Sequence, residues 1–178
     1  MSYQLRPVEE SHLSWLRNQR NRPEVMDFCR QPFLLNELNQ EDWWKKSSRE
    51  RSMIPFIFAE GQTWIGYVAF SNIDWIARRA EFSVFIMPEY AGKGIGRIAI
   101  EMLLDYGFRN LGFQKIYTDT FDINEGEIEL LKEMGFQVTG TLPRHYFKRG
   151  KLIGSVCHSM FAEDFKLLLR EEKNSKPL

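Results

Sequence analysis

Three apolar segments in the middle of the chain, residues 53–60, 63–73 and 80–87, are joined by connections too short to hold a helix. The segments are rich in Phe, Ile and Val, which favour β-strands. Parallel strands need a crossover of a dozen or more residues, so strands with such short links pair antiparallel. The pair Gly61-Gln62 fits a tight hairpin turn between the first two strands. We therefore expect an antiparallel sheet at the centre of the fold.

Helices and further strands are expected on both sides of this sheet. Apolar periodicity predicts helices over 9–21, 36–51, 95–110, 124–136 and 162–172, and strands over 3–8, 115–121, 136–142 and 152–161. Residues 143–151 read as a loop or as a hairpin that turns at Arg149-Gly150. The pattern predicts a mixed α/β fold with one layer of sheet flanked by helices. The 178 residues suit a single domain over 1–170, followed by a C-terminal tail over 171–178.

Composition narrows the class of protein. Lysine plus arginine equals aspartate plus glutamate, at 24 each, and a nucleic-acid binder would show a basic excess. The arginines at 17–22 are interpreted as a solvated helix end. No stretch approaches the ~18 apolar residues of a membrane span, and the first ten residues do not read as a signal peptide. Cys29 and Cys157 have no metal-ligand spacing and suit free thiols. We expect a cytoplasmic protein without a metal and without a nucleic-acid or membrane partner.

Three glycines, Gly92, Gly94 and Gly96, come directly before the clearest helix in the sequence. The Walker pattern is absent because no Ser or Thr follows Lys93 in place. A dinucleotide fingerprint fits residues 94–99, but PEYA separates it from the strand, and the strands before it are antiparallel. One glycine would serve an ordinary helix entry. Three favour a cradle of main-chain N–H groups for a pyrophosphate at the positive end of the helix.

These residues also carry a family resemblance. MPEYAGKGIGRIAIEMLLDYGF closely resembles the coenzyme A motif of the GNAT superfamily of N-acetyltransferases, whose core is Q/R-x-x-G-x-G/A. NEGEIELLKEMGF is similar to the family's later N-x-x-A-x-x-x-Y-x-x-x-G-F segment. RNRPEVMDF resembles the ribosomal-protein N-terminal and amino-sugar branches, and the central region resembles spermidine acetyltransferases. The resemblance covers about residues 3–165. It implies a mostly antiparallel sheet splayed after the fourth strand and acetyl-CoA as cosubstrate. Homodimers are common in the resembled branches, and the sequence leaves the oligomeric state open.

The resemblance implies a set of cofactor-binding residues. Main-chain groups in the splay would pair with pantetheine, the glycine-rich turn would hold the pyrophosphate, and one asparagine would reach the pantetheine arm. In this chain these residues are, in the same order, Phe85, Ile86 and Met87; Gly92, Lys93, Gly94, Ile95, Gly96 and Arg97; and Asn124.

Two positions depart from the family's pattern. Ala91 stands where the core motif opens with Gln or Arg, which predicts weaker binding of the pyrophosphate. The binding should still be intact, because most of the pyrophosphate contacts are main-chain. Leu131 stands where the family has the Tyr that protonates the departing thiolate, and Glu127 replaces the small residue before it. Another group is then the acid, the thiolate leaves without one, or the protein binds acyl-CoA without transfer. Outside candidates for the acid are Tyr146, Tyr117 and Asp119.

A carboxylate near the centre of the sheet would attract an ammonium group and accept its proton. Glu81, inside a Phe- and Val-rich strand, matches the glutamate of the family's fourth strand. The alternative is a surface pair with Arg78 or Arg79. The sequence thus predicts acetyl-CoA-dependent N-acetylation of a primary amine by direct attack on the thioester, with a small amino sugar or polyamine as acceptor. A protein N-terminal α-amine and a non-catalytic acyl-CoA-binding domain are the alternatives.

Overall fold

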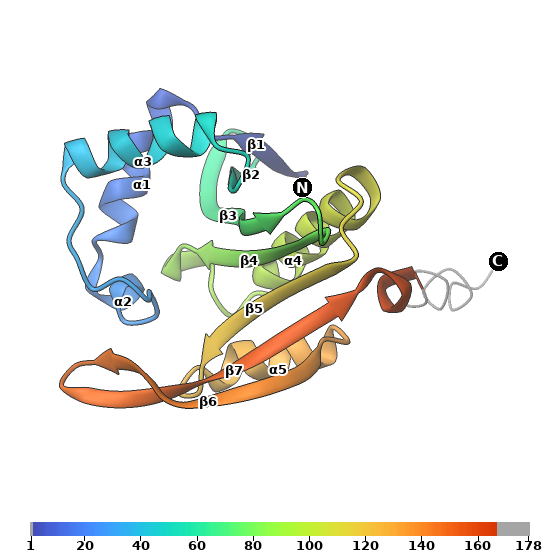
Figure 1. The fold of residues 1–178 in the computed structure, drawn as a ribbon. Helices are drawn as coiled ribbons and strands as arrows, with labels where there is room; N and C mark the ends of the chain where they lie inside the picture. Colours follow the sequence, from blue (N-terminus) through green and yellow to red (C-terminus); the bar gives the residue numbers. More distant parts are fainter. Residues whose placement is uncertain (1, 167–178) are drawn as a thin grey trace.

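A computed structural model describes residues 2–166, which form one seven-stranded sheet with helices on both faces (Figure 1). The strand order is β1-β2-β3-β4-β5-β7-β6, and β4–β5 is the parallel pair among the six described pairs, the others being antiparallel. The strands are β1 (Tyr3–Pro7), β2 (Ile54–Glu60), β3 (Thr63–Asp74), β4 (Arg79–Ile86), β5 (Lys115–Phe121), β6 (Gln137–Lys148) and β7 (Lys151–Phe161). The helices are α1 (Leu13–Arg20), α2 (Pro23–Met26), α3 (Glu37–Arg49), α4 (Ile95–Asp105) and α5 (Glu125–Glu133). Short 3₁₀ turns span Glu10–His12 and Pro88–Tyr90, and a π-helical turn spans Tyr106–Asn110.

Side-chain alternation along β2 divides the interior between the two faces of the sheet. Phe56 and Phe58 belong to the larger core, which α4 and the end of α5 cover. Ile57 and Ala59, between and after them, belong to a smaller core under α1 and α3. Successive residues of a strand point to opposite faces, so the apolar run of β2 is buried on both. The mixed α/β fold predicted from the sequence is confirmed.

Helix α4 packs its apolar stripe on β3 and β4 (Figure 1). Ile95, Ala99, Ile100, Leu103 and Leu104 are buried, at the i, i+4 and i+1 spacing of one helix face. The charged side chains of this helix lie on its other face. This packing fixes the helix N-terminus beside the end of β4, where the glycine-rich turn enters it.

Strands β4 and β5 pair only over their first residues and then separate. Their parallel register runs from Arg79 opposite Lys115 to Glu81 opposite Tyr117, although β4 continues to Ile86 and β5 to Phe121. Figure 1 shows the two strands diverging toward the side that holds α2. The splay predicted after the fourth strand is therefore present, and it opens directly beyond Glu81.

The C-terminal part extends further as strand than the sequence predicted. Residues 143–148 continue β6 against β7, with register shifts at two places, so the segment left open between loop and hairpin is a hairpin. It turns at Arg149-Gly150, where both residues have positive φ, 45° and 78°. Residues 162–166 are helical, as expected for the closing helix. The rest of that helix and the tail over 171–178 lie outside the described residues.

Candidate active site

A cavity of about 710 Å³ opens where β4 and β5 part. Its floor is formed by residues of β4 and β5, and its outer wall by α1, α2, α3 and the segment that joins α2 to α3. The first turn of α5 closes one end. The charged side chains that line it are Arg20, Arg30, Asp42, Glu81, Asp119 and Glu127. Pockets in mixed sheets form where neighbouring strands separate, because main-chain groups there lack a strand partner.

Glu81 lies on the floor of this cavity and is 5% exposed. One carboxylate oxygen forms an ion pair with the Arg30 guanidinium, and the other accepts a hydrogen bond of 2.6 Å from the Asn72 amide. The alternative, a surface pair between Glu81 and a neighbouring arginine, does not form with Arg79. The Arg79 guanidinium instead lies 3.5 Å from the Asp74 carboxylate. A buried carboxylate needs such partners to stay charged. The predicted catalytic carboxylate of Glu81 thus lies in the cavity and is bound to Arg30 and Asn72.

Arg30 is a site residue that the sequence did not single out. It comes from the segment between α2 and α3, and besides Glu81 it donates a hydrogen bond of 3.0 Å to the Asp119 main-chain oxygen on β5. The guanidinium therefore spans the splay from one strand to the other. No local pattern around residue 30 signals this, because its partners lie about fifty and ninety residues away in the sequence.

The turn before α4 has the form of an anion cradle. Gly92 and Gly94 have φ of 72° and 74°, the left-handed region that favours glycine. Gly94 is the N-cap residue and no side chain caps the helix, so its first-turn N–H groups are directed out of the N-terminus. A Cβ on Gly92 or Gly94 would meet no protein atom within 4 Å. The surface above the turn is open, which fits a phosphate group at the positive end of the helix.

Gly96 gives a sharper test of this fit. It lies inside the first turn of α4 with ordinary helical φ, and a Cβ there would come no nearer than 4.0 Å to Leu130. Neither backbone strain nor protein packing requires glycine at this position, and glycine destabilises a helix interior relative to alanine by about 1 kcal/mol. Close approach of a ligand to the main chain explains the residue. The Arg97 side chain itself is paired with Glu133 of α5 at 2.5 Å, leaving its N–H for such a contact.

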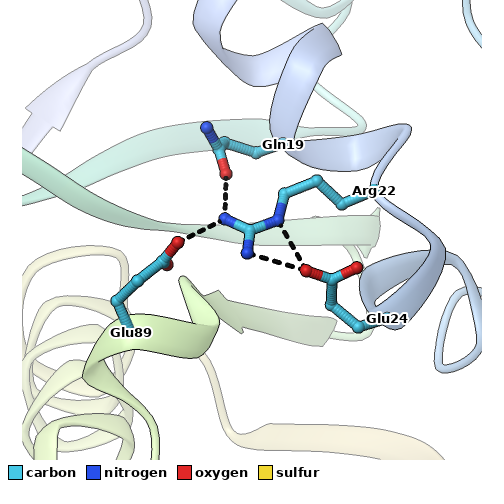
Figure 2. Close-up of polar contacts among 4 residues, drawn as sticks. All are labelled: Gln19, Arg22, Glu24 and Glu89. Carbon is cyan, nitrogen blue, oxygen red and sulfur yellow. Dashed lines mark hydrogen bonds and ion pairs between the residues drawn. The ribbon is translucent and has the colours of Figure 1, made fainter.

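Arg22 links the N-terminal helices to the 3₁₀ turn that precedes the glycine-rich turn. Figure 2 shows Arg22, just before α2, between Gln19, Glu24 and Glu89. Its guanidinium donates to Glu89, in the 3₁₀ turn before Gly92, at 2.7 Å, and to Glu24 and Gln19 at 2.7–3.1 Å. The arginines at 17–22, interpreted from the sequence as a solvated helix end, therefore include two residues with tertiary contacts. Arg22 connects the segment before α2 to Glu89, and Arg20 lines the cavity.

The main-chain groups expected to pair with pantetheine are only partly available. Beyond Glu81, β4 has no β5 partner for Phe85 and Ile86. Met87, however, donates its N–H to Ile65 at 2.9 Å, and its carbonyl accepts from Tyr90 at 2.8 Å. Both main-chain groups of Met87 are thus engaged within the protein, whereas the prediction needs them free. The 3₁₀ turn that follows β4 uses both of them.

The first turn of α5 brings Asn124 and Glu127 to the end of the cavity. The Asn124 amide donates a hydrogen bond of 2.7 Å to the Glu127 carboxylate. Burial raises the pKa of Glu127 to about 7, against the opposing effects of the Thr120 hydroxyl and the Arg30 charge. Leu131, one turn further along, is fully buried in the larger core. The position of the family's Tyr thus holds only an apolar packing side chain.

The other candidates for a proton donor are either hydrogen-bonded to each other or do not line the cavity. The Tyr146 hydroxyl donates to the Asp119 carboxylate at 2.5 Å, and burial with this bond raises the pKa of Tyr146 to about 12. Burial also raises the pKa of Tyr117, which is not among the residues lining the cavity. Asp119 lines it, with one carboxylate oxygen accepting from Tyr146. A phenol held in this way is a poor acid near neutral pH.

Two adjacent indoles on α3 separate as helix geometry requires. Trp43 lines the cavity, whereas the Trp44 ring nitrogen donates to the Val8 main-chain oxygen at 3.1 Å. Arg20 lines the same wall, and one of its guanidinium nitrogens is buried without a hydrogen-bond partner. The wall of the cavity formed by the N-terminal helices therefore combines aromatic surface with charges of both signs.

Fold and site together define an acyltransferase that takes its acyl group from a coenzyme A thioester. The family model for the acetyltransferase (GNAT) domain matches residues 3–137, and the chain belongs to that family. It is 29% identical over 164 residues to a spermidine N(1)-acetyltransferase of Escherichia coli K12, covering 92% of this chain and 88% of the relative. A Vibrio cholerae relative with the same activity is 32% identical over 150 residues, covering 83% and 86%.

Solved structures give the same result for the fold. The structure of a Vibrio cholerae spermidine N-acetyltransferase in complex with CoA and spermine matches with a TM-score of 0.88 at 28% identity, covering 92% of this chain and 98% of that one. The expectation of a GNAT enzyme that uses acetyl-CoA is confirmed. No helix within residues 2–166 is long and apolar enough to cross a membrane. No group of three metal-ligating side chains occurs in that range either.

Proposed function

We propose that this enzyme transfers the acetyl group of acetyl-CoA to a primary amine of a small molecule in the cytoplasm, with a polyamine as the first candidate acceptor. The observation that carries the proposal is the splay of β4 and β5 between a glycine cradle at α4 and a cavity containing Glu81. Spermidine acetyltransferases are among the relatives, and four carboxylates against two arginines line the cavity, which favours a cationic acceptor.

In this proposal the chain holds acetyl-CoA mainly through its backbone. Residues 92–97 bind the pyrophosphate, Phe85 and Ile86 pair with the pantetheine, and Asn124 lies beside that arm. Bound acetyl-CoA supplies the activated acetyl group. Lys93 and Arg97 contribute N–H groups, since their side chains are engaged with the Glu89 carbonyl and with Glu133. A main-chain N–H in the splay polarises the thioester oxygen.

Glu81 attracts the acceptor ammonium and takes up a proton from it, directly or through water. Its two oxygens each keep a lone pair beyond the bonds to Arg30 and Asn72. Arg30 fixes the carboxylate in one orientation, which positions the amine toward the splay. Because Arg30 also binds β5, the acceptor site and the splay are set by the same side chain.

A second acceptor class is favoured by Arg20. Its unpartnered, buried nitrogen would bind an anionic substituent, and the aromatic side chains of the same wall would stack a base or sugar. A nucleotide-linked amino sugar has all of these features. Under this alternative, Arg20→Ala raises KM for an anion-bearing amine and leaves KM for a polyamine unchanged or lower.

The test measures thiol release from acetyl-CoA against a panel of polyamines, amino sugars and N-terminal peptides, for the wild type and Glu81→Gln. We expect turnover with a small amine and a kcat at least about 100-fold lower in Glu81→Gln. Turnover only with peptides would assign a protein N-terminal acetyltransferase. Tight CoA binding without turnover on the whole panel would assign a non-catalytic acyl-CoA binder. Sedimentation of the same sample measures the expected homodimer.

A further inference from the structure

The helix that carries Leu131 also presents a carboxyl group on the same face. Residues four apart lie one above the other on a helix, so Glu127 is one turn before Leu131 and nearer the helix N-terminus. Leu131 is fully buried and has no proton to give. Glu127 is only partly buried and lines the cavity at the splay. A group that exchanges protons is therefore present on the face where the family's hydroxyl is missing.

The surroundings of Glu127 hold its carboxyl group in a fixed place. The Asn124 amide donates to one oxygen at 2.7 Å, so this oxygen is oriented from within the same turn. The Thr120 hydroxyl of β5 also acts on this carboxyl group and favours its charged form. The charged groups that share the cavity with it are Arg20 and Arg30 on the N-terminal wall, Asp42 on α3, Glu81 on β4 and Asp119 on β5.

We propose that Glu127 is the acid–base group that carries a proton from the acceptor amine to the departing sulfur, in place of the absent tyrosine. The inference rests on the proposed function. The ionised carboxylate takes one proton from the acceptor ammonium. The nitrogen forms the C–N bond, the C–S bond breaks, and Glu127 gives its proton to the sulfur. A second ammonium proton leaves to solvent by way of Glu81, so the amide and free thiol are formed with the charge balanced.

Glu127 suits this role better than the other carboxylates of the cavity. Glu81 is tied to Arg30 and Asn72, and Asp119 accepts from Tyr146. The pKa of Glu127 is raised to about 7 by burial. A group that must both accept and donate a proton works best when its pKa is near the working pH. An ordinary glutamate would be too weak a base and, once ionised, would rarely be protonated.

The first test compares Glu127→Gln with Glu125→Gln, a matched control on the exposed side of the same helix turn. In the wild type we expect kcat/KM for the amine to rise with pH through about 7, where Glu127 ionises. Glu127→Gln should lower kcat about 100-fold or more and abolish that inflection, with KM for acetyl-CoA changed less than about threefold. Glu125→Gln should match the wild type. Unchanged kcat and an unchanged pH profile in Glu127→Gln would overturn the inference while leaving the transferase assignment intact.

A second test does not depend on turnover. Carboxyl ¹³C NMR of the free protein should show one glutamate titrating near pH 7, and this signal should vanish in Glu127→Gln but persist in Glu125→Gln. A midpoint for Glu127 near the ordinary glutamate value would overturn the inference. If the wild type released no thiol with any amine, the proposed function would fall as well, and the titration would then report only a buried carboxyl group.

Discussion

Replacing Gly96 by alanine separates the stability of the fold from the binding of coenzyme A. The added Cβ would lie 4.0 Å from Leu130, an ordinary contact, and the position has helical φ. Alanine exceeds glycine in helix propensity by about 1 kcal/mol in a helix interior, so the free energy of unfolding should rise by up to that amount. The same methyl group would stand in the space where a pyrophosphate meets the first turn of α4.

The expected loss of affinity follows from the hydrogen bonds at stake. A charge-assisted hydrogen bond to a phosphate contributes about 1.5–3 kcal/mol, so displacing one such bond weakens CoA binding roughly 10- to 150-fold. Stability and affinity should therefore change in opposite directions. A substitution that merely damaged the helix would lower both.

Gly126 provides the matched control. It is the second residue of α5, as Gly96 is of α4, and a Cβ there would meet no protein atom within 4 Å. Urea denaturation measures the stability of both variants, and isothermal titration calorimetry measures the Kd of CoA. We expect Gly126→Ala to bind like the wild type. If Gly96→Ala bound CoA as tightly as Gly126→Ala, the main chain of α4 would not be the diphosphate site.

Three further predictions concern the walls of the site. Arg22→Ala, or Glu89→Gln, should raise KM for acetyl-CoA by up to about fivefold with little change in Tm, since an exposed ion pair contributes little to stability; non-additivity in the double variant would show that both act through the one contact. Gly66→Ala should destabilise the protein by about 1–3 kcal/mol in urea titrations, because its Cβ would lie 2.5 Å from the Phe85 carbonyl oxygen. The pKa of Glu127 is higher in the fold than in the unfolded chain, so the stability that Glu127 contributes at pH 4 should be lost, by about 3 kcal/mol, as pH rises to 7. The loss is read as the difference between the wild type and Glu127→Gln, and an identical pH dependence in both would contradict it.

Local sequence patterns were enough to predict much of the fold. The strands β2, β3 and β4 follow from apolar segments with short links, and α4 follows from its periodicity, because both depend on neighbours in the chain. The order of the motifs also identified the family, and with it the splay. The continuation of β6 through residues 143–148 did not follow, because that strand is defined by its pairing with β7 rather than by its own composition.

The glycine cradle is local as well, since φ at Gly92 and Gly94 and the helix that follows are set within ten residues. The chemistry of the cavity is not. Arg30 meets Glu81 only because the α2–α3 segment folds across the splay, and Arg22 meets Glu89 only because α2 lies beside the turn before α4. In both ion pairs, the two charged residues are tens of residues apart in the sequence and meet only in the folded structure.

The same holds for Glu127, whose pKa depends on burial between β5 and α5 and not on its sequence context. The sequence by itself determined the central antiparallel strands, the central helix and the glycine-rich turn before it, since short-range sterics and periodicity fix these. Only the tertiary structure decided which carboxylates are paired and which are desolvated. Desolvation and charge pairing act through space, across segments that the chain brings together only when it has folded.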